Sequence, residues 1–217
     1  MQLVIGNKNY SSWSLRPWLL MQHLSVSFEE RKLWLFTEQM KAHMQQVSPS
    51  LKVPVLIDNG LTIWDSLAIC EYLNDQYLRG EGWPQQIAAK AQARSICAEM
   101  HAGFFAVREE MPMNVRREKA AIVLSDQANT EIQRIITIFS QCLDKSKEGD
   151  SATEYLFGDF SIADAFFMPI VIRFSIYQIQ VPENVKQYMQ HMLSLPAYKI
   201  WQADAIAETA VIAVAEV

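Results

Sequence analysis

All strand patterning in this sequence lies before residues 80–86, and none follows them. This stretch, GEGWPQQ, is rich in Gly, Pro and polar residues, which is typical of a linker. With 217 residues, the chain is long enough to bury two modest cores. The sequence therefore predicts two domains, residues 1–79 and 88–217, joined by a linker at 80–87.

The first domain is predicted to alternate strands and helices. Apolar, β-branched and helical spacings predict a strand, a helix, an edge strand, a short helix or turn, a hairpin and a final helix. In that order the segments are residues 2–6, 11–24, 26–35, 38–47, 53–63 and 66–78, with Asn59-Gly60 as the hairpin turn. The resulting order, β-α-β-α-β-β-α, is thioredoxin-like.

The second domain is predicted to be an α-helical bundle. Its helix candidates are residues 88–110, 116–144, 161–177, 185–193 and 197–207. Residues 145–153 are polar and predict a loop, and the closing AVIAVAEV is interpreted as either a tail or a strand. The predicted fold class is thus α/β followed by all-α.

Charge and length exclude several classes of partner. The net charge of −5 and the scattered Lys and Arg disfavour nucleic acid and anionic membranes. The longest apolar run, residues 163–172, is interrupted by Asp164 and Pro169 and is too short to cross a bilayer.

Cysteine and histidine usage points to a cytoplasmic protein without a metal. Three cysteines with no CxxC pair suit a reducing compartment, and the four histidines form no metal-binding motif. No secretory signal is visible at the N-terminus.

The segment from Lys52 to Ser66 carries the clearest binding pattern. Pro54 opens a strand, and a cis Val53-Pro54 bond would leave the backbone of Val53 free to pair with a peptide. Asp65 and Ser66 stand at a predicted helix start, where hydroxyl and N–H donors bind a carboxylate and Asp65 accepts from an ammonium group. Simple helix capping by either residue is compatible with this interpretation.

The stretch VPVLIDNGLTIWDSLAICEYL resembles the glutathione site of the glutathione transferase superfamily. The resemblance implies that Val53 pairs with the cysteinyl backbone of glutathione and that Asp65 and Ser66 bind its γ-glutamyl end. FGDFSIAD, at residues 157–164, is similar to a structural capping motif of the same family and extends the resemblance into the second domain.

The segment Ser11-Ser12-Trp13-Ser14-Leu15-Arg16 is similar to the Ser-Ser-Cys-Ser-x-Arg motif of the zeta class and its maleylacetoacetate isomerases. On this match Ser11 stabilises the glutathione thiolate, with Ser12 as the alternative and Ser14 nearby. Arg16 either helps electrostatically or forms an ion pair. Trp13 replaces the class's cysteine.

Two further positions are expected to contact glutathione, and other positions depart from the class. The resemblance implies a contact from Gln39, and Lys52 is within expected reach of the glycyl carboxylate. Phe105 stands where the class has a glutamine, and Arg173 lies three residues from its arginine. A helical stripe interpreted as core, dimer interface or second-substrate pocket comprises Phe104, Phe105, Arg108, Met111 and Met113.

The expected activity is that of a glutathione transferase acting on a small hydrophobic electrophile, in a homodimer as is usual for the family. The alternatives are glutathione-dependent cis–trans isomerisation and a non-catalytic binding or regulatory protein on the same fold. A disulfide reductase is disfavoured because no cysteine occupies residues 10–14.

Overall fold

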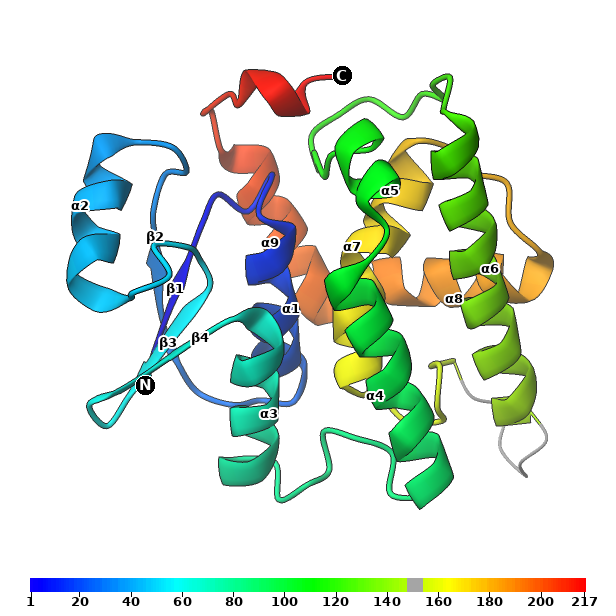
Figure 1. Ribbon diagram of the computed structural model, residues 1–217, viewed down its shortest axis with the longest axis horizontal. Helices are drawn as coiled ribbons and strands as arrows, with labels where there is room; N and C mark the ends of the chain where they lie inside the picture. Colours follow the sequence, from blue (N-terminus) through cyan, green and yellow to red (C-terminus); the bar gives the residue numbers. More distant parts are fainter. Residues whose placement is uncertain (148–153) are drawn as a thin grey trace.

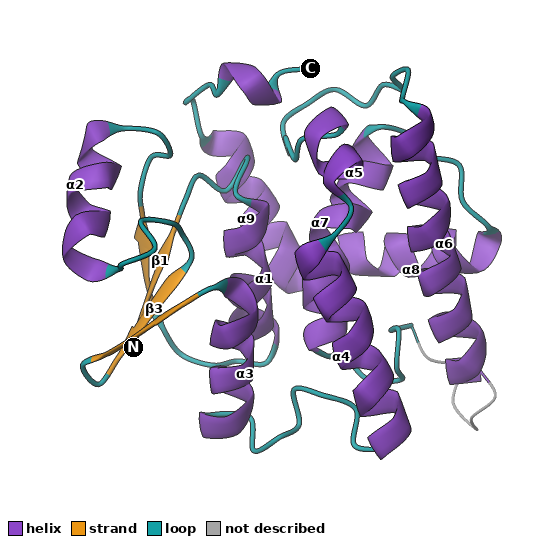
Figure 2. Cartoon of the chain, viewed as in Figure 1, coloured by secondary structure: helices purple, strands orange, loops and turns teal. Residues whose placement is uncertain are grey.

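A four-stranded sheet forms the N-terminal part of the computed structural model, which describes residues 1–147 and 154–217. The strands, coloured orange in Figure 2, are β1 (Gln2–Ile5), β2 (Glu29–Lys32), β3 (Val55–Asp58) and β4 (Leu61–Trp64). They lie in the order β2-β1-β3-β4. Strand β1 runs parallel to β2 and antiparallel to β3, while β3 and β4 form the hairpin.

Alternation along the strands buries both faces of the sheet. Leu3 and Ile5 of β1 join the main core with α1 (Ser12–His23) and α3 (Ser66–Gln76). Val4 points to the opposite face, where it packs against Met44 of α2 (Glu38–Val47). Figure 1 shows α2 on one side of the sheet and α1 and α3 on the other.

The second strand is the charged edge that the sequence predicted. Its four residues, EERK, are all exposed, and it pairs only with β1. Charged side chains on such an edge discourage pairing with another chain.

The C-terminal part is helical, and α7 (Ile162–Ile176) lies at its centre. Every residue of α7 except Ser175 is buried, and α7 contacts α1, α4 and α8. The other elements are α4 (Ile87–Ala102), α5 (Phe105–Glu110), α6 (Asp126–Lys147), α8 (Glu183–Ser194), α9 (Pro196–Ala207) and a 3-10 turn at Ala213–Ala215. A thioredoxin-like domain followed by a helical domain confirms the predicted fold class.

The helix predicted at residues 88–110 is wrong in one respect, because it breaks into α4 and α5. Gly103 ends α4, and Phe104 adopts a left-handed conformation with φ of 58°. The guanidinium of Arg108 folds back and donates to the carbonyls of Met100 and His101, which α4 leaves free at its end. The break is thus stabilised by a tertiary contact that helical spacing cannot reveal.

The helix predicted at residues 116–144 is also wrong at its start, since α6 begins only at Asp126. The preceding segment is irregular because its polar groups bond to a distant loop. The backbone N–H of Arg116 donates to Asn9 Oδ1 at 2.9 Å, and Asn9 Nδ2 donates to Asn114 Oδ1 at 2.8 Å.

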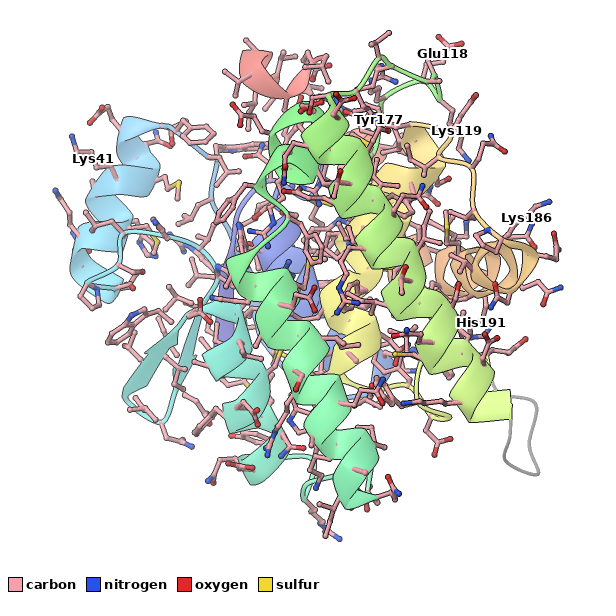
Figure 3. The ribbon with its side chains drawn as sticks, turned by 45° about the vertical axis from the view of Figure 1, so that its right-hand side comes forward. Lys41, Glu118, Lys119, Tyr177, Lys186 and His191 are labelled. Carbon is pink, nitrogen blue, oxygen red and sulfur yellow. The ribbon has the colours of Figure 1, made fainter. Side chains whose placement is uncertain are left out.

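The same irregular segment is fixed to the end of α7. Lys119 Nζ donates to Ser175 Oγ at 2.9 Å, and the hydroxyl of Tyr177 donates to the carbonyl of Pro112 at 3.0 Å. Figure 3 shows Lys119 and Tyr177 near each other at the same end of the molecule, far from Lys41 on α2.

The loop predicted after α6 and the C-terminal segment also differ from, or decide between, the expectations. The loop predicted at residues 145–153 starts later, because α6 continues to Lys147, and residues 148–153 lie outside the described residues. The C-terminal AVIAVAEV is a tail containing a 3-10 turn rather than a strand.

The capping box predicted at the start of α7 is present. Ser161 Oγ accepts from the N–H of Ala163 at 3.3 Å, and Asp164 Oδ2 accepts from the N–H of Ser161 at 2.9 Å. Burial raises the pKa of Asp164 to about 6, despite the bonds from Leu156, Ser161 and Tyr188. Asp164 is thus enclosed in the fold and serves the structure.

Candidate functional site

The serine loop, residues 10–13, includes the first two residues of α1. Ser11 is the residue preceding the helix, yet its side chain caps no backbone N–H. Its hydroxyl instead donates to Ser14 Oγ at 2.7 Å, and Ser14 Oγ also accepts from the N–H of Gly6 at 3.2 Å. Ser14 is therefore a buried link between β1 and α1, while Ser11 faces a cavity.

Ser12 faces the same cavity as Ser11 and is partly exposed. Within the described part of the chain, no hydrogen bond is formed by the Ser12 hydroxyl. The hydrogen of Ser12 is therefore available to a ligand, whereas that of Ser11 is already given to Ser14.

Arg16 lies behind the serine loop, fully buried against aromatic rings. Its guanidinium carbon is 4.1 Å from the ring centroid of Trp13 and 4.6 Å from that of Phe166. Burial above all, then the positive charges of Arg108 and Arg173, lower the pKa of Arg16 to about 9. Among residues 1–147 and 154–217 it forms no ion pair, so of the two expectations for Arg16 the ion pair is wrong.

A second polar group lies at the start of α3. Asp65 adopts a φ of 76° and caps the helix, with its Oδ1 accepting from the N–H of Leu67 at 2.8 Å. Asp65 Oδ2 lies 3.2 Å from Nε2 of His101 on α4. Ser66 beside it is 1% exposed, and its Oγ has no hydrogen-bond partner among the described residues. A buried hydroxyl without a partner is uncommon, and a polar ligand atom in the adjoining cavity would supply the partner that Ser66 Oγ lacks.

Two adjoining cavities connect these groups. A cavity of about 340 Å³ is lined by Asp65, Ser66 and His101, and a larger one of about 840 Å³ is lined by Ser11 and Ser12. Both share four lining residues, which are Trp13, Lys52, Val53 and Arg108. The bond between Val53 and Pro54 is cis, as the binding hypothesis required.

Most of the predicted site residues come together at these cavities, and three do not. Gln39 is exposed on α2 and lines neither cavity, although its neighbours Glu38 and Met40 line the larger one. Ser14 and Arg16 lie in the interior behind the serine loop.

The structure divides the helical stripe of the second domain. Phe105 and Arg108 line the cavities, whereas Phe104, Met111 and Met113 are buried in the core. Arg173 lies outside the cavity linings, where burial lowers its pKa to about 10 and its Nε donates to the carbonyl of Met111 at 2.7 Å.

Sequence reasoning missed two contributions to the site. His101 belongs to no motif in the sequence, but it pairs with Asp65, which lies far from it in sequence. Ile212, Val214 and Ala215 of the C-terminal tail line the larger cavity. Neither has a local motif, because each reaches the site through the packing of distant elements.

The described residues contain neither a metal-binding cluster nor a membrane-spanning helix. No group of three or more His, Cys, Asp or Glu side chains there is placed to hold a metal ion. No helix within residues 1–147 and 154–217 has the length and apolar character needed to cross a membrane.

Comparison with known sequences matches residues 10–76 to the glutathione S-transferase N-terminal domain. A probable maleylacetoacetate isomerase of Caenorhabditis elegans is 25% identical over 191 residues, covering 86% of each chain.

Solved structures share the fold across both domains. A glutathione transferase homolog from Burkholderia, crystallised with bound glutathione, superposes with a TM-score of 0.72 at 22% identity, covering 94% of this chain and 97% of its own. The holo form of maleyl pyruvate isomerase, a bacterial zeta-class protein, gives 0.71 at 18% identity, with 97% and 100% covered.

Residues 10–76 thus match the glutathione S-transferase N-terminal domain, and the two-domain fold is one that solved glutathione transferase structures share. Two of the proteins that this chain resembles are isomerases, and one of them is a zeta-class protein.

Proposed function

We propose that the protein is a glutathione transferase that activates the glutathione thiol for attack on a small hydrophobic electrophile. The observation that carries the proposal is the buried, unpartnered Ser66 hydroxyl beside Asp65, in a cavity that adjoins the one lined by Ser11 and Ser12. No metal takes part in this proposal.

The smaller cavity suits the γ-glutamyl end of glutathione. Its carboxylate accepts from Ser66 Oγ and from the backbone N–H of Ser66, aided by the helix dipole, since the amides of Leu67 and Ala68 already donate to Asp65. Its ammonium group donates to Asp65, which is partly exposed there. At the middle of the glutathione molecule, the backbone of Val53 pairs with the cysteinyl backbone, and Lys52 attracts the glycyl carboxylate.

The thiol then lies at the serine loop, where Ser11 or Ser12 donates a hydrogen bond to the thiolate. Ser12 is free to donate as it stands, while Ser11 must turn away from Ser14. Lowering a thiol pKa by two units requires about 2.7 kcal/mol. A hydrogen bond to an anion contributes about 1.5–3 kcal/mol and a helix N-terminus about 0.3–1 kcal/mol, so these two groups are sufficient.

The proposed reaction forms one bond and breaks another. The thiolate sulfur attacks the electrophilic carbon, a carbon–sulfur bond forms, and a halide or similar group leaves with the electron pair of its bond. The thiol proton is released to solvent. The larger cavity offers mainly apolar side chains for the electrophile, among them Leu35, Met40, Pro112 and Ile212.

The isomerase relatives favour a second candidate, glutathione-dependent cis–trans isomerisation. In that reaction the thiolate adds to a conjugated double bond, the single bond rotates, and the thiolate leaves unchanged. The third candidate is a glutathione-binding protein without catalysis.

Product and thiol measurements on the same enzyme separate these candidates. Transferase activity consumes thiol stoichiometrically with an activated aryl halide, whereas isomerisation of a maleylacetoacetate-type substrate leaves the thiol concentration unchanged. Ser11→Ala and Ser12→Ala are compared with Ser95→Ala, a control on exposed α4. We expect one of the first two to lower kcat/KM about ten- to hundredfold. If both leave it unchanged, the serine mechanism is wrong.

The family resemblance and the reduced cysteines also lead us to propose a cytoplasmic homodimer. All three cysteines, Cys70, Cys97 and Cys142, are buried and free. Light scattering on the purified protein would give the oligomeric state, and a monomer at micromolar concentration would contradict the dimer.

A further inference from the structure

The C-terminal segment, residues 208–217, forms one wall of the larger cavity. Ile212, Val214 and Ala215 line that cavity together with residues from the segment 35–41. Val214 is 81% exposed, so its apolar side chain is free to contact a ligand. Figure 1 shows this segment crossing above α9 at the top of the molecule.

The segment has little regular structure of its own and is fixed by side chains from other elements. Arg116 Nη2 donates to the carbonyl of Ala210 at 2.8 Å, and its Nη1 donates to that of Glu208. Asn114 Nδ2 donates to the carbonyl of Ala215 at 3.2 Å, and Arg117 Nε donates to that of Val217 at 2.7 Å.

Tyr10 connects this segment to the serine loop. Its hydroxyl accepts from Arg116 Nη2 at 2.9 Å and from the N–H of Ile212 at 3.3 Å, and donates to the carboxylate of Glu216. Tyr10 is adjacent to Ser11, so the residue that fixes the wall belongs to the loop that meets the thiol. Since these bonds occupy the hydroxyl, Tyr10 is a positioning residue in this arrangement.

We propose that Tyr10 and Arg116 act as a clamp that holds residues 208–217 against the serine loop, and that this wall recognises the apolar group bonded to the glutathione sulfur. The inference rests on the proposed glutathione site. The smaller cavity contains neither Tyr10 nor Arg116, so the clamp affects the sulfur substituent and leaves the γ-glutamyl end of glutathione unaffected.

Two ligands test the clamp: glutathione and S-hexylglutathione, each titrated calorimetrically into the full-length protein. The wild type is expected to bind the hexyl derivative more tightly. Tyr10→Phe and Arg116→Gln are expected to leave the Kd for glutathione within about twofold and to reduce the advantage of the hexyl derivative roughly three- to tenfold.

Matched controls remove other hydroxyl and guanidinium groups. Tyr72→Phe removes a bond to Asp58, and Arg134→Gln removes an ion pair with Glu99, and neither residue lines the cavities. Both controls should keep the hexyl advantage. Val214→Ala should reduce it, whereas Val211→Ala, an exposed neighbour outside the lining, should not.

Specific results overturn the inference. An unchanged hexyl advantage in Tyr10→Phe and Arg116→Gln, or equal weakening of both ligands, excludes the clamp while the glutathione site stands. Failure of the wild type to bind glutathione instead refutes the proposed function, and the inference with it. If Arg116→Gln does not fold, as judged by circular dichroism, Tyr10→Phe decides the question because it keeps the ring.

Discussion

Ser66 is a residue whose position makes better sense with a ligand than without one. It is buried, its hydroxyl has no partner in the described structure, and it stands at the first turn of α3. Asp65 already caps that helix, so the Ser66 hydroxyl is not needed for the fold.

Ser66→Ala should therefore separate binding from stability. Loss of a hydrogen bond to a charged group costs about 1.5–3 kcal/mol, so the Kd for glutathione should rise at least about tenfold. The midpoint of thermal unfolding should not fall, because no internal bond is lost. Titration calorimetry and circular dichroism measure the two quantities. A lower unfolding midpoint with unchanged affinity would give Ser66 a structural role instead.

Strand β3 and helix α3 are joined at their ends by a cluster of hydroxyls and one carboxylate. Asp58, at the end of β3, accepts from the hydroxyl of Tyr72 at 2.8 Å and from that of Tyr77. The pKa of Asp58 is lowered, and the hydrogen bond from Tyr77 is the largest cause. The ionised carboxylate thus stabilises the contact between these two elements.

This contact predicts a pH dependence of stability. Because the folded pKa of Asp58 is lowered, its stabilisation is present above the ordinary pKa of about 4 and is lost as the pH falls through the folded value. Tyr77→Phe should therefore destabilise the protein at pH 7, with a difference that shrinks toward pH 3. Urea unfolding across this range measures it.

A second variant makes the test specific to the carboxylate. In an Asp58→Asn background, the effect of Tyr77→Phe should not vary with pH, because the titrating group is absent. A difference that persists with the same pH dependence in this background would show that another group is responsible.

At the scale of elements, the sequence predicted the structures that depend on contacts between residues near each other in the chain. Residues 38–47 were predicted as a short helix or turn and form α2 with the same bounds, and Ser161 and Asp164 predicted the capping box. Both depend on neighbours within a few residues. The start of α6 was wrong, because the N–H of Arg116 bonds to Asn9, more than a hundred residues away in sequence.

The candidate site shows the same division. Val53, Asp65 and Ser66 were predicted from one continuous segment, and the structure brings them to a single cavity. His101 and Val214 have no local motif, and only the packing of α4 and the C-terminal segment carries them to the two cavities.

At the scale of the whole molecule, the candidate site is formed by residues from both domains. The thioredoxin-like domain provides the serine loop, Val53 and Ser66, while the helical domain provides His101 and Arg108. Helices α1 and α7 pack together in the interior, which holds the two sets of residues in a fixed relation. A protein that only binds glutathione can be distinguished from one that also activates its thiol. Only the second must stabilise the thiolate anion.

The most direct test of the account is the ionisation of glutathione bound to the protein. The ultraviolet absorbance of the thiolate, titrated against pH with the protein in excess, gives the pKa of the bound thiol. We predict a value about two units below that of an ordinary thiol near 8.5, and a return toward that value in Ser11→Ala or Ser12→Ala. A bound thiol that titrates like free glutathione would contradict the account.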